Sequence, residues 1–169
     1  LVGNGKSQKH LCIVMTADRG LCGGFNTSIC RKARSFFNEQ LKLGKELKII
    51  TVGSKGNDQL KRVFGKYIVE KISFKDLKEI TVNEADLITS KIISMYTKDE
   101  FDICTIFYNK FKSVISQIPQ AQQIIPIPAN DEKRKNLENN NDQSQYEYEP
   151  EEEEILENLL PKNISTQIF

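Results

Sequence analysis

The chain has 169 residues, of which 38% are hydrophobic, and this is enough apolar material for one globular domain but not for two. The 24 basic and 23 acidic side chains leave a net charge of +1, which excludes the strongly basic proteins that bind nucleic acid by charge alone. No apolar run reaches the roughly 18–20 residues of a membrane-spanning helix, and the first residues lack the apolar core of a signal peptide.

Strand-like and helix-like patterns alternate along most of the chain. Short apolar or β-branched runs predict strands at 10–17, 47–52, 67–72 and 101–108. Apolar residues at helical spacing predict helices that start near Phe25, Gly53 and Val82, the last with Asn83 as a possible N-cap. A parallel strand pair needs a long crossover, and a helix is the usual one. The sequence therefore predicts an α/β fold, with a mostly parallel or mixed sheet covered by helices.

The pattern changes after Tyr108. Residues 110–128 contain three prolines and predict a long extended edge strand, and the polar run 129–145 predicts a mobile loop. A short strand at 146–149 and a helix that begins with Pro150 and ends at Pro161 are expected next. Charge changes as well, because residues 1–128 carry 20 basic and 12 acidic side chains, whereas residues 129–169 carry 4 and 11. The acidic end is expected to form a separate surface or tail.

Two glycine-rich stretches have the composition of phosphate-binding loops. Gly3–Ser7 ends in Gly-Lys-Ser, as a P-loop does, but it leads into a strand instead of a helix, so a flexible leader over 1–8 is the better interpretation. Gly20–Gly24 lies between a predicted strand and a predicted helix, where a dinucleotide-binding fold has its glycine turn. Its spacing is GxxGG instead of GxGxxG, so tight packing of a helix on a strand is the competing explanation.

Candidate catalytic and metal-binding groups are few. The single histidine, His10, cannot supply a multi-histidine metal site. Asp18 and Arg19 are a possible acid and anion binder, although adjacent opposite charges after a strand more often fix a loop. The acidic run Glu151–Glu154 is explained by a helix start without any cation. We therefore expect neither catalysis nor a cofactor or metal. The four cysteines show no CxxC spacing and, Cys22 apart, lie in apolar stretches, which favours reduced thiols in a reducing compartment.

Three stretches together resemble the gamma subunit of F-type ATP synthase. They are Thr16–Asn26 (TADRGLCGGFN), Tyr108–Ser113 (YNKFKS), and Tyr148–Pro150 followed by Leu159–Pro161. Their order and spacing match over essentially all of 9–169. The resemblance implies a Rossmann-like three-layer domain over 9–128, completed by 146–163, and a truncated carboxy-terminal helix over 164–169. It also implies that the chain is a fragment that lacks the two long helices of the family's coiled-coil shaft.

The resemblance further implies a non-catalytic rotor subunit that couples proton flow through the membrane c-ring to ATP synthesis or hydrolysis. Its expected partners are the alpha, beta and epsilon subunits (delta in mitochondrial naming) and the c-ring, without nucleic acid. The expected location is peripheral, on the cytoplasmic face of a bacterial inner membrane or on the matrix side in an organelle. The family's foot region implies four partner-contact residues: Tyr146, Tyr148, Glu149 and Pro150. A covering role for the two tyrosines over a hydrophobic edge is equally compatible with the sequence.

Two other functions remain open at this stage. One is a nucleotide-binding doubly wound domain that uses the turn Gly20–Gly24, for which a saturable site for ATP, ADP or NAD would be expected. The other is an independent adaptor with an acidic tail, for which a complete gene product of about this size would be expected. The rotor interpretation instead expects a reading frame that extends beyond both ends and encodes long amphipathic helices.

Overall fold

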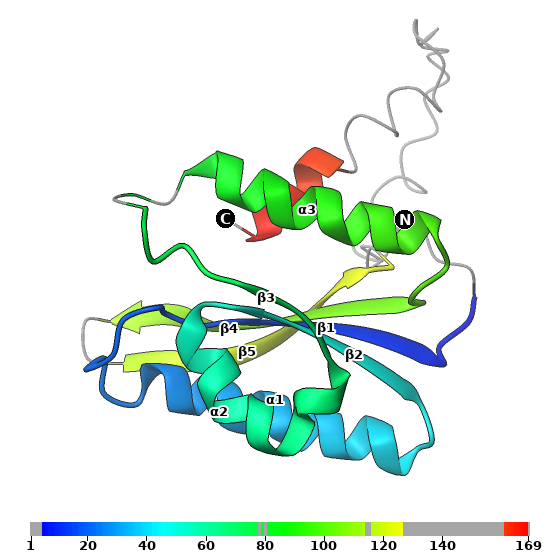
Figure 1. The fold of residues 1–169 in the computed structure, drawn as a ribbon, viewed down its shortest axis with the longest axis horizontal. Helices are drawn as coiled ribbons and strands as arrows, with labels where there is room; N and C mark the ends of the chain where they lie inside the picture. Colours follow the sequence, from blue (N-terminus) through cyan, green and yellow to red (C-terminus); the bar gives the residue numbers. More distant parts are fainter. Residues whose placement is uncertain (1–4, 78, 80, 114–115, 127–160, 169) are drawn as a thin grey trace, which may run out of the picture.

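The structure is a computed structural model that describes residues 5–77, 79, 81–113, 116–126 and 161–168. Five strands form one sheet in the order β3-β2-β1-β4-β5, with helices on both faces (Figure 1). The strands are β1 (Lys9–Met15), β2 (Glu46–Val52), β3 (Ile68–Ile72), β4 (Ile103–Ser113) and β5 (Ser116–Ile125). The helices are α1 (Phe25–Lys42), α2 (Ser54–Phe64), the 3-10 turn η1 (Gly65–Tyr67) and α3 (Val82–Thr97). The predicted α/β fold class is confirmed.

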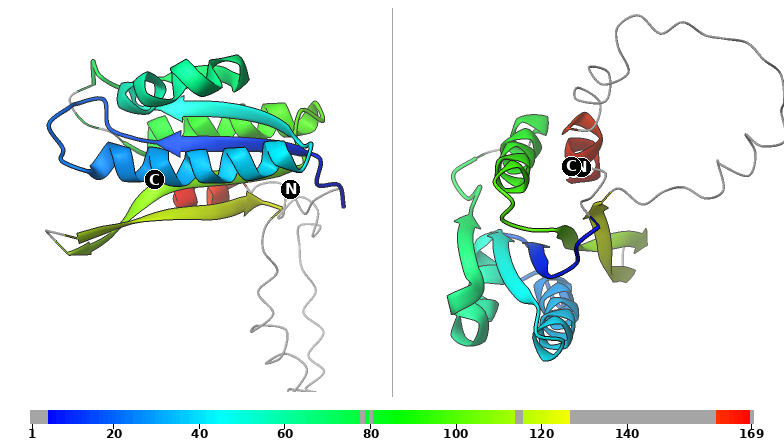
Figure 2. Two further views of the ribbon diagram at one scale, coloured as in Figure 1. Left: turned by 90° about the horizontal axis from the view of Figure 1, so that it is seen from below. Right: turned by 90° about the vertical axis from the view of Figure 1, so that its right-hand side faces the viewer.

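The first four strands are parallel, and β5 is antiparallel to β4. The helices α1 and α2 lie side by side on one face of the sheet, and α3 covers the other face together with a helical segment at 161–168 (Figures 1 and 2). Each crossover between parallel strands contains a helix, as the alternating sequence pattern predicted. The order places β1 at the centre of the sheet. The chain first moves outward from β1 to β2 and β3, and then crosses back to form β4 on the other side of β1. The direction of the crossovers therefore reverses between β1 and β4.

The predicted single edge strand over 110–128 is wrong in its first part. Residues Lys110–Ser113 continue β4, and the chain then turns back as β5, so that Lys110 pairs with Ile118. Pro119 fits within β5 because it lies on an edge strand of the sheet, where its missing N–H leaves no neighbouring strand unpaired. The edge position is confirmed, whereas the extent of the strand is corrected.

The helix α3 begins two residues earlier than an N-cap at Asn83 predicted. Thr81 is the N-cap. Its side chain accepts a hydrogen bond from Asn83 N, and the Glu84 carboxylate accepts one from Thr81 N. This reciprocal arrangement is a capping box, and it satisfies amides that the first helical turn otherwise leaves unpaired. Asn83 therefore lies inside the helix, and its predicted role as N-cap is wrong.

Two apolar clusters hold the helices on the sheet. On the α1–α2 face, Phe37 is fully buried and packs edge-on against Phe64 and Phe107. On the α3 face, aliphatic residues of the strands meet Ile88 and Ile92 of the helix. Burial of a large apolar side chain contributes roughly 1.5–3 kcal/mol, so these two clusters supply most of the driving force for folding.

The α3 face is completed by the last described residues. The segment 161–168 is helical, and its Ile164 and Ile168 are buried in the α3-side cluster. Ser165 donates a hydrogen bond to Asp86 of α3. Helical structure is thus present from Pro161, where the sequence predicted that a helix would end. The predicted loop at 129–145 and the predicted elements at 146–160 lie outside the described residues.

Candidate functional site at the carboxyl end of the sheet

The carboxyl ends of β1, β2 and β3 are connected by one acidic side chain. Asp18 follows β1, and its Oδ1 accepts hydrogen bonds from Ser54 N and Ser73 Oγ, both at 2.7 Å. Its Oδ2 accepts a third from Phe74 N at 2.9 Å. Ser54 begins α2, while Ser73 and Phe74 follow β3. The carboxylate therefore ties three segments together that are far apart in the sequence.

Hydrogen bonds control the ionisation of this group. Partial burial by itself would raise the pKa of Asp18, but the bonds from Ser73, Ser54 and Phe74 outweigh it and hold the pKa below the usual range. The carboxylate is thus ionised at neutral pH. A catalytic acid needs a proton at that pH. Of the two roles considered for Asp18 in the sequence, the geometry therefore favours fixing a loop over acting as an acid.

A close backbone approach accompanies the Asp18 contacts. Thr16 Oγ1 accepts a hydrogen bond from Gly56 N at 2.8 Å and donates to Val52 O at 3.1 Å. Gly53 has a φ of +86°, and a Cβ at this position would lie 2.1 Å from Thr16 O. Only glycine combines this left-handed backbone with so short a distance. The first turn of α2 is therefore packed directly on the end of β1.

The predicted nucleotide site, Gly20–Gly24, lies before α1, whereas these contacts concern the start of α2, a second place where a phosphate could bind. In a dinucleotide-binding fold, the positive end of a helix dipole beside the sheet receives the phosphates. Here the amide of Ser54 at the start of α2 already binds the Asp18 carboxylate. A phosphate at the same place would meet a fixed negative charge, so the geometry of α2 does not favour a nucleotide.

The predicted glycine turn Gly20–Gly24 forms an exposed loop before α1. Leu21 has a φ of 59° and is fully exposed, and the Cys22 thiol lies 3.3 Å from Gly20 O. Behind the loop, Asn109 of β4 donates to Phe25 O at 3.0 Å. The loop is thus anchored at the start of α1, while its apolar tip faces solvent.

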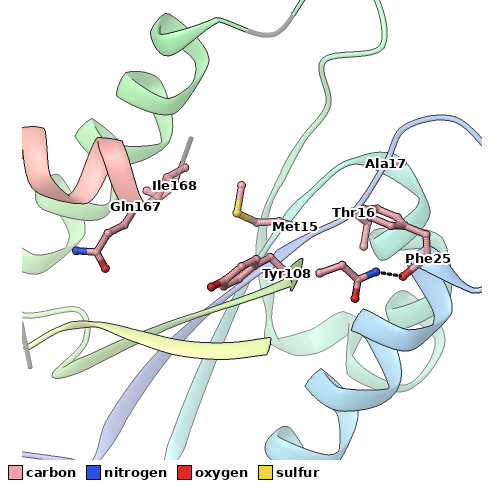
Figure 3. A pocket seen from close by; sticks show the side chains of 8 residues that line it. Met15, Thr16, Ala17, Phe25, Tyr108, Gln167 and Ile168 are labelled. Atoms are coloured by element: carbon pink, nitrogen blue, oxygen red, sulfur yellow. Dashed lines mark hydrogen bonds between the residues drawn. The ribbon is translucent and has the colours of Figure 1, made fainter. Parts of the chain in front are cut away.

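A cavity of about 410 Å³ lies beside this anchor, at the point where the crossover direction reverses (Figure 3). It is lined by Met15, Thr16, Ala17, Phe25, Tyr108, Asn109, Gln167 and Ile168. Its polar groups are bonded to the protein itself: Tyr108 donates to Gln122 at 2.9 Å, and Gln122 donates to Gln167 at 2.9 Å. The cavity therefore presents mainly an apolar surface.

The four predicted partner-contact residues, Tyr146, Tyr148, Glu149 and Pro150, lie outside the described residues, as does the acidic run 151–154. His10 is buried at the start of β1, with its ring against Phe36. The three cysteines expected in apolar stretches are buried free thiols, and Cys22 is exposed. Over the described part of the chain, no cluster of three potential metal-binding side chains occurs, and no helix is both long and apolar enough to span a membrane.

A family model described as ATP synthase matches residues 1–169. The chain belongs to the ATP synthase family. Its sequence relatives are gamma chains: the ATP synthase gamma chain of Pelagibacter ubique (strain HTCC1062) is 60% identical over 169 residues. The gamma chain of Jannaschia sp. (strain CCS1) is 48% identical over the same length. The resemblance to the gamma subunit is thus confirmed.

The gamma chain relatives are longer than this chain. It is covered completely in both alignments, but it spans only 56% and 57% of the relatives' own lengths. Solved structures show the same fold. The central stalk and c-ring structure of the Tetrahymena thermophila mitochondrial ATP synthase contains a chain with a TM-score of 0.71 and 23% identity. That match covers 96% of this chain and 67% of the other. A rotor chain of the Euglena gracilis mitochondrial enzyme has a TM-score of 0.66 and 20% identity, with 96% and 59% covered.

The role of Asp18 was only partly visible in the sequence. Its position after a strand indicated a loop-fixing residue, but its partners lie 36 and more positions away. No local spacing marks Ser54 and Ser73 as those partners. The glycine at 53 was a signal of close approach, since a glycine directly after a strand permits a left-handed backbone.

Proposed function

We propose that this chain is the globular part of a gamma subunit in the rotor of an F-type ATP synthase. It would couple proton flow through the membrane c-ring to ATP synthesis or hydrolysis in the ring of alpha and beta subunits. The observation that carries the proposal is the 60% identity to a gamma chain along the whole chain. The match in fold to a central stalk supports it independently of sequence.

A rigid body suits this role, since a part that transmits torque loses work when it deforms. The sheet is covered on both faces by packed apolar clusters, and close-packed protein interiors have low compressibility. At the carboxyl end, Asp18 and Thr16 connect β1 with the start of α2 by direct hydrogen bonds. The described strands and helices would therefore move as one unit.

The domain is proposed to be non-catalytic. Enzymes with open α/β sheets place their reacting groups at the carboxyl ends of the strands. At this end of the sheet, the Asp18 carboxylate and the Thr16 hydroxyl are both engaged by the protein's own backbone. Chemistry would take place in other subunits, and this chain would supply shape and stiffness.

The proposed partners are the epsilon subunit (delta in mitochondria), the c-ring and the alpha and beta subunits. The chain would be bound peripherally to the membrane through the c-ring, on the cytoplasmic side in a bacterium or the matrix side in a mitochondrion. Tyr146, Tyr148, Glu149 and Pro150 are proposed as contact residues of the foot. Their motif is the only residue-level support for this part of the proposal.

The foot contacts are tested by the double substitution Tyr146→Ala/Glu149→Ala in the full-length gamma chain of the assembled enzyme. ATP hydrolysis by the detached catalytic part should be unchanged. ATP-driven proton pumping in membrane vesicles should fall about fivefold or more, the effect of losing about 1 kcal/mol of contact energy. The matched control is Lys75→Ala/Lys98→Ala, at two exposed positions elsewhere on the domain. Unchanged pumping in the double variant would remove both residues from the proposed contact.

A further inference from the structure

The two helical layers of the domain differ strongly in charge. The elements α1, α2 and η1 carry eight basic and two acidic side chains, a net charge of +6. The helix α3 on the opposite face carries two acidic and one basic side chain. The eight basic residues are Arg31, Lys32, Arg34, Lys42, Lys55, Lys61, Arg62 and Lys66. We call their surface the basic face.

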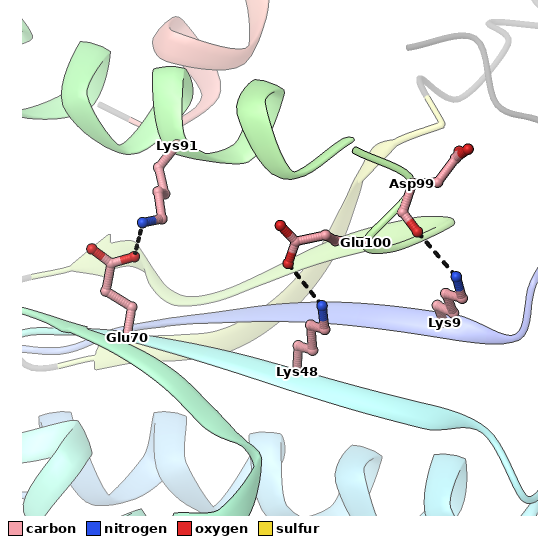
Figure 4. Close-up of polar contacts among 6 residues, drawn as sticks. All are labelled: Lys9, Lys48, Glu70, Lys91, Asp99 and Glu100. Carbon is pink, nitrogen blue, oxygen red and sulfur yellow. Dashed lines mark hydrogen bonds and ion pairs between the residues drawn. The ribbon is translucent and has the colours of Figure 1, made fainter. Parts of the chain in front are cut away.

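Three basic residues on the α3 side have partners within the protein. Lys91 of α3 lies 2.7 Å from Glu70, Lys48 lies 2.8 Å from Glu100, and Lys9 Nζ donates to Asp99 O (Figure 4). On the basic face, the only ion pair among the described residues joins Lys61 and Asp58. Most of the positive charge on the basic face is thus not neutralised by neighbouring carboxylates of the described chain.

The basic face spans two neighbouring helices. The guanidinium of Arg34 in α1 donates to Gln59 O in α2, so the two helices lie side by side at this level (Figure 1). Arg31, Lys32 and Lys42 are exposed on α1, and Arg62 and Lys66 are exposed at the end of α2 and in η1. Charges on both helices can therefore reach a single bound segment.

Helix stability explains only part of this distribution. Lys42, Lys61 and Arg62 lie in last turns, where cations interact favourably with the helix dipole. Arg31 and Lys32 lie near the middle of an 18-residue helix, where the dipole contributes little. Arg31 and Arg34, three residues apart on the same helix, also repel one another. A partner that carries negative charge would relieve this repulsion.

The surroundings of the charges select the kind of partner. Single-stranded nucleic acid binds on exposed aromatic side chains, but the aromatic residues of α1, α2 and η1 are all buried or half-buried. A helix that lies on a membrane needs an exposed apolar stripe, whereas Val63 is the single large apolar residue exposed within these three elements. We propose that the basic face docks an acidic segment of a partner protein, through carboxylates that pair with Arg31, Lys32 and Arg62.

The test measures binding of a fluorescein-labelled glutamate-rich peptide to the chain by fluorescence anisotropy. The triple variant Arg31→Glu/Lys32→Glu/Arg62→Glu should lower the affinity about tenfold or more, because attraction is replaced by repulsion at the face. The control Lys75→Glu/Lys98→Glu/Lys162→Glu changes the net charge equally at exposed positions outside the basic face, and its affinity should stay within about threefold of the unmodified chain. A second triple variant with glutamine at positions 31, 32 and 62 should show a smaller loss in the same direction.

Far-UV circular dichroism and thermal unfolding of each variant separate loss of binding from loss of fold. Equal losses in the face variant and the control would overturn the proposal, since they would show an effect of net charge alone. The proposal would also be overturned by tighter binding to an oligonucleotide or to vesicles with anionic lipid than to the peptide. None of these outcomes depends on rotor function.

Discussion

The two faces of the sheet are covered by different kinds of segment: one by helices next to their strands in the sequence, and the other partly by residues far along the chain. On the α1–α2 face, the apolar cluster uses residues between Cys12 and Phe107, and each helix directly follows the strand it packs beside. On the α3 face, the cluster includes Ile164 and Ile168, which come after residues 127–160. One face is therefore built from local crossovers, whereas the other depends on a segment that returns from far along the chain.

This difference has a mechanical consequence. The α1–α2 face needs no residue beyond Phe107, so it can form once the first four strands and the helices α1 and α2 are present. The α3 face loses part of its core whenever 161–168 moves, so it is expected to open locally at a lower free energy. Four substitutions probe this comparison.

The largest effect is expected from Phe37→Ala. Phe37 is fully buried on the α1–α2 face and contacts the rings of Phe64 and Phe107. Its removal leaves a cavity and should lower the free energy of unfolding by about 3–5 kcal/mol. Urea unfolding followed by circular dichroism measures this value. A loss below about 1 kcal/mol would show that the α1–α2 face is not the stable side.

The second effect is expected from Ile164→Ala, the corresponding change on the α3 face. Ile164 is fully buried, and its truncation should lower the free energy of unfolding by about 2–4 kcal/mol. Hydrogen exchange should accelerate in α3 and in 161–168, while the amides of α1 keep their protection. Equal acceleration in α1 would contradict separate opening of the two faces.

The third effect concerns Asp18, which connects the carboxyl ends of β1, β2 and β3. Asp18→Ala leaves the amides of Ser54 and Phe74 without their acceptor and should lower the free energy of unfolding by about 1–3 kcal/mol. The neighbouring exposed Arg19→Ala is the control, and its expected change is within about 0.5 kcal/mol. The contribution of Asp18 should also disappear in acid, as the pH falls through its lowered pKa. Similar stabilities of the two variants would show that the carboxylate does not tie the segments together.

The smallest effect is a pH dependence that originates at His10. Burial and the nearby Lys45 ammonium lower the pKa of His10 below 6.5, although the Ser7 carbonyl and Asp102 act in the opposite direction. The unfolded chain therefore binds this proton more readily, and stability is lost as the pH falls from 6.5 toward the lowered pKa. The slope cannot exceed about 1.4 kcal/mol per pH unit, the value for one proton.

The variant His10→Gln isolates this contribution. The stability difference between the unmodified chain and the variant should shrink between about pH 7 and pH 5, because only the unmodified chain titrates at this position. Chemical denaturation at several pH values measures it. Parallel curves for the two proteins would show that His10 keeps its ordinary pKa in the fold.

Much of the fold could be predicted because periodicity is a local property. The helix from Phe25 and the strand through Leu47–Val52 are visible in their own residues, and so is α3. The hairpin of β4 and β5 was missed because residues 110–113 continue an extended pattern, and only pairing shows where the chain reverses. The N-cap was misplaced although Thr81 and Glu84 have capping-box spacing, since Asn83 is an equally common capping residue type.

The candidate site was less accessible to sequence reasoning. Asp18 binds groups at positions 54, 73 and 74, and such long-range hydrogen bonds leave no trace in spacing. The basic face could not be predicted either, because the charge total of residues 1–128 says nothing about which side of the sheet carries it. The family, in contrast, was recognised from three stretches that match in order and spacing, the longest of them Thr16–Asn26, and it is confirmed by the relatives.

The rotor proposal is tested most directly by following a label on this domain in the whole enzyme. Cys22 is the exposed cysteine, while Cys12, Cys30 and Cys104 are buried, and burial raises the pKa of the Cys30 thiol to about 11. A maleimide dye should therefore react at Cys22, in a complex whose other subunits lack reactive cysteines. With the catalytic ring fixed to a surface, we expect the polarisation of the dye to report continuous rotation in one direction during ATP hydrolysis. A dye that keeps a fixed orientation while ATP is hydrolysed would contradict the proposal.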